Sequence, residues 1–200
     1  MGTYNQQYFF MMEPRQREDT PSLTPDDNTA NRRYDHEQED KGSPPLVFFN
    51  GAKDFQKTNG VTAAQPGNVL FDGSSIIVTT DIRRELLKLT IPGLYTHPAI
   101  YIHDDGEWHE NYWYLTFETL FDCWDREGST YDPEPGGFGD FIYYEIYNFS
   151  LNSELLDKTP LDQRLLFKMG NASDAFITCH KSIKHLFEGE GVELVAISDW

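Results

Sequence analysis

Short apolar runs, separated by charged or turn-forming residues, recur along this chain and predict strands more often than helices. The predicted strands cover residues 8–12, 46–49, 69–71, 76–79, 100–102, 112–117, 141–149, 164–168, 176–178 and 192–197. Asp104-Asp105-Gly106 lies between two of them and is typical of a hairpin turn. The pattern therefore indicates a sheet-rich protein.

Two segments have helical spacing instead. Their apolar positions are Ile82, Leu86 and Leu89 in the first and Ile183, Leu186 and Phe187 in the second. Asp81 is a suitable N-cap for the first helix, and Pro92-Gly93 ends it. Because the helices do not alternate with strands throughout, we predict an α+β domain. Its sheet is mixed or mostly antiparallel, with a few helices packed on one face.

The composition divides the chain into three parts. Residues 1–12 contain the first strand, and residues 46–200 form a single α+β domain. Between them, residues 13–45 hold Leu23 as their one large aliphatic side chain, among charged residues and prolines. Such a segment buries too little apolar area to offset its ordering entropy, so we expect an acidic, flexible insertion or tether.

The charge balance narrows the choice of partners. Sixteen Lys and Arg against 33 Asp and Glu give a net charge of −17. This field repels phosphate backbones, which argues against nucleic acid as a partner, and it steers a basic protein toward the surface.

Two cysteines, Cys123 and Cys179, are too few for a disulfide framework or a four-cysteine zinc site and suit a reducing cytosol. No apolar run has the length of a signal-peptide core or of a membrane span. We therefore expect a cytoplasmic protein that does not contact the membrane.

Three groups of residues have side chains that could take part in catalysis or metal binding. His103, Asp105 and His109 could serve a metal-dependent hydrolase, but their spacing matches no metal motif, and a solvated loop is the simpler interpretation. Asp122 and Asp125 could act as acid and base, but a turn cap and an ion pair with Arg126 are favoured. The thiol of Cys123 lies beside a carboxylate, which makes it a poor nucleophile. We therefore expect no catalysis, metal or cofactor.

Binding accounts better for the aromatic and acidic residues between positions 104 and 127. Interfaces concentrate their free energy in Trp and Tyr side chains ringed by polar groups. Strand alternation assigns Trp113, Leu115 and Phe117 to the core and turns Tyr112 and Tyr114 outward. The predicted contact residues are Asp104, Asp105, Glu107, Trp108, Glu110, Tyr112, Tyr114, Asp122, Trp124, Asp125 and Glu127. A third hypothesis is an adaptor domain that meets its partners through residues 13–45.

A resemblance supports the binding interpretation. The strand from Tyr112 to Leu115, followed by Asp122, Asp125 and the turn 126–129, resembles immunity-protein family eleven of bacterial polymorphic toxin systems. Ile77-Val78-Thr79 and the segment from Phe176 to Val192 are similar to further motifs of that family, so the likeness covers roughly residues 68–200.

The resemblance implies a non-catalytic protein that neutralises a cognate toxin, often one delivered by contact-dependent or type VI secretion. The negative charge fits a basic toxin such as a nuclease, whose active site an acidic face could occlude.

Overall fold

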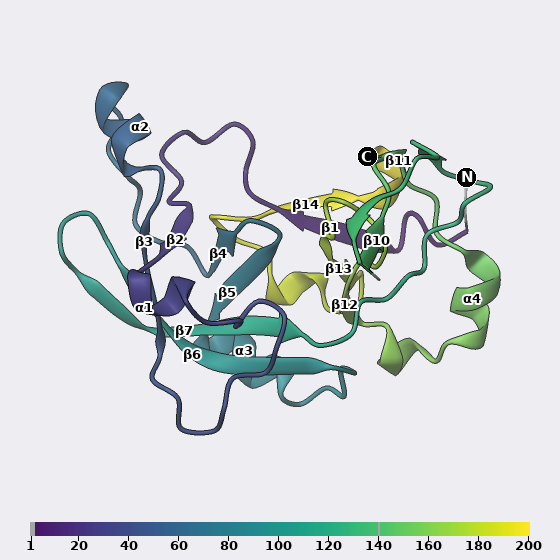
Figure 1. Cartoon of the computed structure of the whole chain (residues 1–200), viewed down its shortest axis with the longest axis horizontal. Helices are drawn as coiled ribbons and strands as arrows, with labels where there is room; N and C mark the ends of the chain where they lie inside the picture. The colour runs from purple at the N-terminus through teal and green to yellow at the C-terminus, as the bar shows by residue number, and fades with distance from the viewer. Residues whose placement is uncertain (1–2, 140) are drawn as a thin grey trace.

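The computed structural model describes residues 3–139 and 141–200, and two sheets dominate it (Figure 1). Met1 and Gly2, part of the predicted segment 1–12, lie outside the described residues. The larger sheet has six strands in the spatial order β2 (Leu23–Pro25), β3 (Leu46–Asn50), β6 (Leu94–Ile102), β7 (Trp108–Phe117), β5 (Ser75–Thr79) and β4 (Val69–Asp72). Strands β3 and β6 run parallel, and the other neighbours are antiparallel.

The smaller sheet is antiparallel, with the order β12 (Leu166–Lys168), β13 (Ile177–His180), β1 (Tyr8–Met12) and β14 (Glu193–Ala196). Two further antiparallel pairs join β9 (Gly136–Phe138) to β10 (Phe141–Tyr143) and β8 (Thr130–Tyr131) to β11 (Ile146–Asn148). The predicted mixed, mostly antiparallel sheet is thus confirmed, and so is the hairpin, which β6 and β7 form.

The helices are short and scattered. They are α1 (Asp27–Ala30), α2 (Lys53–Thr58), α3 (Thr80–Leu86) and α4 (Ser153–Lys158), with 3-10 turns at η1 (Leu161–Gln163), η2 (Lys184–Leu186) and η3 (Ile197–Asp199). The first predicted helix is α3, but its N-cap is Thr79, so Asp81 lies in the first turn and the prediction of an Asp81 cap is wrong. The helix ends at Leu86, before the predicted end at Pro92-Gly93. The predicted helix near Ile183 is only the turn η2. The helices do not gather on one face of a sheet, so that part of the predicted fold is not found.

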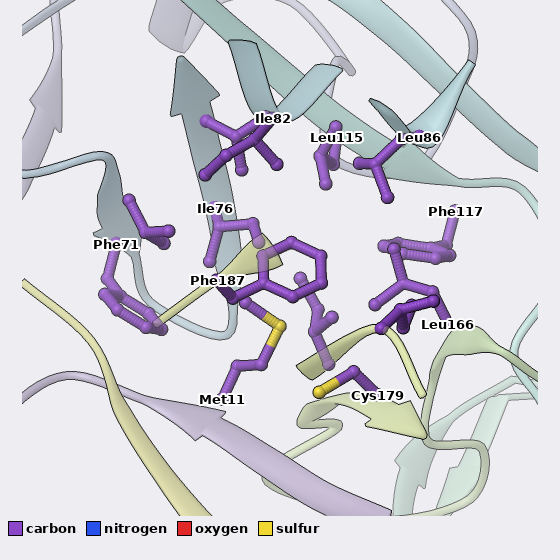
Figure 2. Packing of buried hydrophobic residues seen from close by; sticks show 14 residues of the cluster. Met11, Phe71, Ile76, Ile82, Leu86, Leu115, Phe117, Leu166, Cys179 and Phe187 are labelled. Carbon is purple, nitrogen blue, oxygen red and sulfur yellow. The ribbon is translucent and has the colours of Figure 1, made fainter. Parts of the chain in front are cut away.

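The central core lies between the two sheets. Its side chains come from β4, β5, β7 and α3 on one side and from β1, β12, β13 and Phe187 on the other, and they point toward one another in Figure 2. A second core covers the opposite face of the small sheet, around Tyr8, Phe10 and Trp124. A third covers the opposite face of the large sheet, around Phe48, Tyr101 and Tyr114. Both sheets are therefore buried on two faces over much of their area.

The segment predicted to be a flexible tether takes part in this third core. Residues 20–34, which we call the strap, contain β2 and α1 and bury Leu23, Thr29 and Tyr34. Asp26 caps α1 by accepting a hydrogen bond from the Thr29 amide. The strap is therefore a packed part of the fold, and the expectation of a flexible tether fails for it.

A buried polar group ties the strap to the sheet. The hydroxyls of Tyr34 and Tyr114 donate to the same carboxylate oxygen of Asp72, at 3.0 and 3.3 Å. Burial raises the pKa of Asp72 above its ordinary value and lowers that of nearby Lys168, whose ammonium group donates to Ser75. The network satisfies polar atoms that would otherwise be buried unpaired.

Within the described ranges, no helix combines the length and the apolar character that crossing a membrane requires.

Candidate protein-binding surface

The β6–β7 hairpin ends in a tight turn at one end of the molecule's long axis, on the side that carries α2 (Figure 1). The amide of His103 donates to the Glu107 carbonyl, and the amide of Gly106 donates back to the His103 carbonyl. Gly106 has a φ of +90°, a conformation that other residues rarely adopt. Asp105 closes the turn by accepting a hydrogen bond from the Glu107 amide at 2.9 Å.

The carboxylates of the turn differ in their hydrogen bonds and ion pairs. Asp104 accepts a hydrogen bond from Asn50 and lies 3.5 Å from the ammonium group of Lys53. The Glu107 amide, and after it His103, lowers the pKa of Asp105 below its usual range. Glu107 and Glu110 are exposed and have no ion-pair partner in the described part of the chain. Negative charge is therefore concentrated and partly uncompensated at this end.

Trp108 lies among these carboxylates with 59% of its surface exposed. It is opposite Ile102 on β6, and Ile102 is opposite Phe49 on β3, which is itself 43% exposed. Residues directly opposite each other project from the same face of a sheet, so these three form one apolar row across three strands. Protein interfaces usually combine an apolar centre with a polar rim, and the apolar row with its acidic neighbours has this arrangement.

Tyr112 and Tyr114 do not belong to this surface. The alternation that places Trp113, Leu115 and Phe117 toward the central core is correct, but Tyr112 is 3% exposed and Tyr114 is fully buried. The expectation that they face outward is therefore wrong. The strap covers their face of β7, and Tyr34 packs edge-on against Tyr114 at 4.9 Å between ring centroids.

The remaining predicted contact residues lie elsewhere, in a turn after β7. Arg126 forms a two-point ion pair with Asp122, at 2.5 and 2.7 Å, and its guanidinium lies 3.7 Å from the centre of the Trp124 ring. Asp125 accepts a hydrogen bond from the Glu127 amide and so caps the turn. The favoured interpretation of these carboxylates as a turn cap and an ion pair is confirmed.

Trp124 is not exposed beside them. It is 1% exposed, and its ring packs edge-on against Tyr131 and Tyr144, so the prediction of a partner contact is wrong for this residue. A tryptophan buries a large apolar area, and the second core supplies aromatic neighbours on several sides.

A cavity of about 980 Å³ opens beside this turn. Its walls come from the turn itself, from residues 148–154 and from η3, and they include Asp122, Asp125, Arg126, Glu127 and Glu154. Arg126 already neutralises Asp122, and Lys158 lies 2.5 Å from Glu154. The cavity is thus polar, and three of its charged side chains, Asp122, Arg126 and Glu154, form ion pairs within the chain. Its segments lie in the half of the molecule that carries α4, away from the hairpin turn (Figure 1).

The three residues of the hydrolase hypothesis come near one another without forming a metal site. The rings of His103 and His109 are 6.4 Å apart, and Asp105 lies 3.1 Å from Nδ1 of His103. Nε2 of His103 faces the carbonyl of Ala64 at 3.2 Å. Among residues 3–139 and 141–200, no group of three or more His, Cys, Asp or Glu side chains is placed to hold a metal ion.

Both cysteines are buried and unpaired. Burial raises the pKa of the Cys179 thiol to about 12, and burial together with Asp122 raises that of Cys123. The raised pKa of Cys123 agrees with its interpretation as a poor nucleophile.

Sequence reasoning placed Trp108 at the surface but missed Phe49 and Ile102. The parallel pairing of β3 with β6 brings them beside Trp108. Which residues of two strands lie opposite each other cannot be predicted from the sequence of one strand alone. The signal available was the apolar pair Val47 and Phe49, spaced like Ile100 and Ile102.

No protein-family model matches the chain, and no curated protein is significantly similar to it. The functional interpretation therefore depends on the geometry of the surface and on the motifs of the sequence.

Proposed function

We propose that this chain is an immunity-type protein that acts in the cytoplasm, binds a basic toxin and blocks its active site, without catalysis of its own. The observation that carries the proposal is Trp108, a highly exposed tryptophan on a projecting hairpin with uncompensated carboxylates around it. The resemblance of the motifs after Tyr112 to immunity-protein family eleven supports the same class.

Such a surface can supply the binding free energy that neutralisation of a toxin requires. Nanomolar affinity requires about 12 kcal/mol, and hot spots of interfaces are most often Trp, Tyr and Arg, each contributing roughly 2 kcal/mol or more on truncation. Trp108 supplies one such side chain, and the apolar row extends the area that a partner would bury. Glu107 and Glu110 would form the polar rim and favour a partner with Lys or Arg at matching positions.

The test is co-expression with the protein encoded next to this one. We expect that partner to stop growth alone, and we expect the wild-type chain to restore growth and co-purify with it. Trp108→Ala should weaken the complex by at least about tenfold, the size of a hot-spot truncation.

Tyr147→Ala is the matched control, because Tyr147 is a similarly exposed aromatic residue, at 56%, on β11. It should neutralise as the wild type does. If the wild-type chain neither restores growth nor forms a complex with the neighbouring protein, the proposal fails.

A further inference from the structure

The apolar row is part of a larger uncovered area of the six-stranded sheet. Along β3, Leu46, Phe48 and Asn50 are buried, whereas Val47 and Phe49 between them are partly or largely exposed. Along β6, Ala99 and Tyr101 are buried, whereas Ile100 and Ile102 are partly exposed. The alternation shows that one face of these strands is packed and the other is not.

The register joins the exposed positions into one patch. Val47 is opposite Ile100 and Phe49 is opposite Ile102, which in turn is opposite Trp108. We call these five side chains the open face: Val47, Phe49, Ile100, Ile102 and Trp108. None of them belongs to the three core clusters or to the partly buried residues packed against those clusters.

A helix covers the adjoining part of the same face. Pro98 lies opposite Trp113 and two residues before Ile100, so Trp113 and the open face project to the same side of the sheet. There, α3 packs Ile82 and Leu86 into the central core, and Arg83 stacks on Trp113 at 3.6 Å while donating to Thr96. The cover supplied by α3 thus ends at Trp113, where the open face begins.

The size of the uncovered area suits a single helix. Two strand spacings between β3 and β7 span about 10 Å, and the four-residue step from Pro98 to Ile102 spans about 13 Å. A helix has a diameter of about 10 Å and a pitch of 5.4 Å, so about two to three turns fit. A helix on a sheet face is also the arrangement that α3 already uses next to this area.

The charges nearby determine which kind of helix fits. Glu107 precedes Trp108 in the turn and Glu110 follows it on β7, and both are exposed, as is Asp105 in the same turn. A second copy of this chain would bring two net charges of −17 together, which opposes self-association. A helix with an apolar stripe and Lys or Arg beside that stripe matches both the open face and its acidic rim.

We propose that the open face is a docking site for a basic, amphipathic helix of the partner, which continues the helical layer that α3 begins. This inference rests on the proposed function for the identity of the partner, and on the sheet register for the location of the site.

The experiment uses the full chain and a synthetic amphipathic peptide of about 18 residues, roughly 27 Å as a helix, with a Leu stripe flanked by Lys. Calorimetry should show saturable one-to-one binding, and tryptophan emission should shift to the blue as Trp108 leaves water. Phe49→Ser and Trp108→Ser should each raise the Kd at least about tenfold, a loss typical of interface anchors. Tyr147→Ser, the matched exposed aromatic, should leave the Kd unchanged.

Two further controls separate docking from charge attraction and from self-association. A scrambled peptide of the same composition should bind at least about tenfold more weakly, because it lacks the stripe. Equal binding of the scrambled peptide, or unchanged binding by both Ser variants, would overturn the docking site. A dimer in light scattering that Phe49→Ser dissolves would instead assign the open face to a second copy and overturn the proposed occupant.

These results are independent of the growth assay. If the peptide results hold while the neighbouring protein is not neutralised, the docking site stands and the immunity function fails. If neutralisation holds but Phe49→Ser and Trp108→Ser neutralise fully, the function stands and the docking site fails.

Discussion

At the scale of the residue, two tryptophans of this chain differ in how far they are buried. Trp124 is 1% exposed and packs against Tyr131 and Tyr144, whereas Trp108 is 59% exposed and belongs to none of the core clusters. Burial of an aromatic ring stabilises the fold, while an exposed ring contributes free energy only when a partner covers it. We therefore assign Trp124 to the stability of the fold and propose Trp108 for binding.

This contrast gives the first prediction. Trp124→Ala should lower the free energy of unfolding by about 3–5 kcal/mol, the usual cost of deleting a buried large aromatic side chain. Trp108→Ala should change it by less than about 0.5 kcal/mol, as surface substitutions usually do. Urea denaturation followed by circular dichroism measures both values. Similar losses for the two variants would contradict the assignment.

At the scale of the element, β7 explains why sequence reasoning succeeded only in part. Its alternation correctly separates Trp113 and Leu115 from Tyr112 and Tyr114, because a strand has two faces. Alternation does not reveal whether a second face is covered. That depends on the strap, a segment whose average composition is polar and which was therefore expected to be flexible.

The strap is ordered because a few of its side chains anchor it to the rest of the fold. Leu23 and Tyr34 enter the third core, the backbone of β2 pairs with β3, and the hydroxyl of Thr116 donates to the carbonyl of Tyr34. Composition averages over a segment and misses such anchors. Most of the longer strands were predictable from short apolar runs, but the short strands β2, β8 and β9 were missed, and the predicted strand 141–149 is two strands, β10 and β11, with different partners. The parallel pairing of β3 with β6 depends on contacts between residues about fifty positions apart.

The second prediction concerns this anchoring. Tyr34→Ala should lower the free energy of unfolding by about 3 kcal/mol or more, because it removes a buried ring from the third core and a hydrogen bond to Asp72. Tyr34→Phe keeps the ring and should cost only about 1 kcal/mol. Thermal or urea unfolding of the two variants provides the comparison.

If the strap were only a flexible tether, the unfolding experiment on the Tyr34 variants would give a different result. Both variants would then unfold like the wild type, and limited proteolysis would cut the strap without loss of the remaining structure. Under our interpretation, protease cleavage within residues 20–34 of the folded protein should be slow.

At the scale of the whole molecule, the sign and the distribution of charge act together. The net charge of −17 produces a long-range field, and the carboxylates at the hairpin concentrate part of this charge where the apolar row is exposed. Electrostatic steering raises association rates from about 10⁵–10⁶ to as much as 10⁸–10⁹ M⁻¹s⁻¹ at low salt. Under the proposed function, charge would govern how fast the basic partner associates, and the apolar row would govern how slowly it dissociates.

The third prediction follows from this division. The association rate with the basic partner should fall steeply as salt rises, because charges farther apart than about 8 Å are largely screened at physiological ionic strength. Glu107→Lys with Glu110→Lys should slow association more than Glu134→Lys with Asp162→Lys, two exposed carboxylates outside the hairpin. Both double variants change the net charge by the same amount, so stopped-flow or surface-plasmon kinetics would report the position of the charge. Equal slowing by the two pairs would mean that the field of the whole molecule, rather than the acidic rim of the open face, guides the encounter.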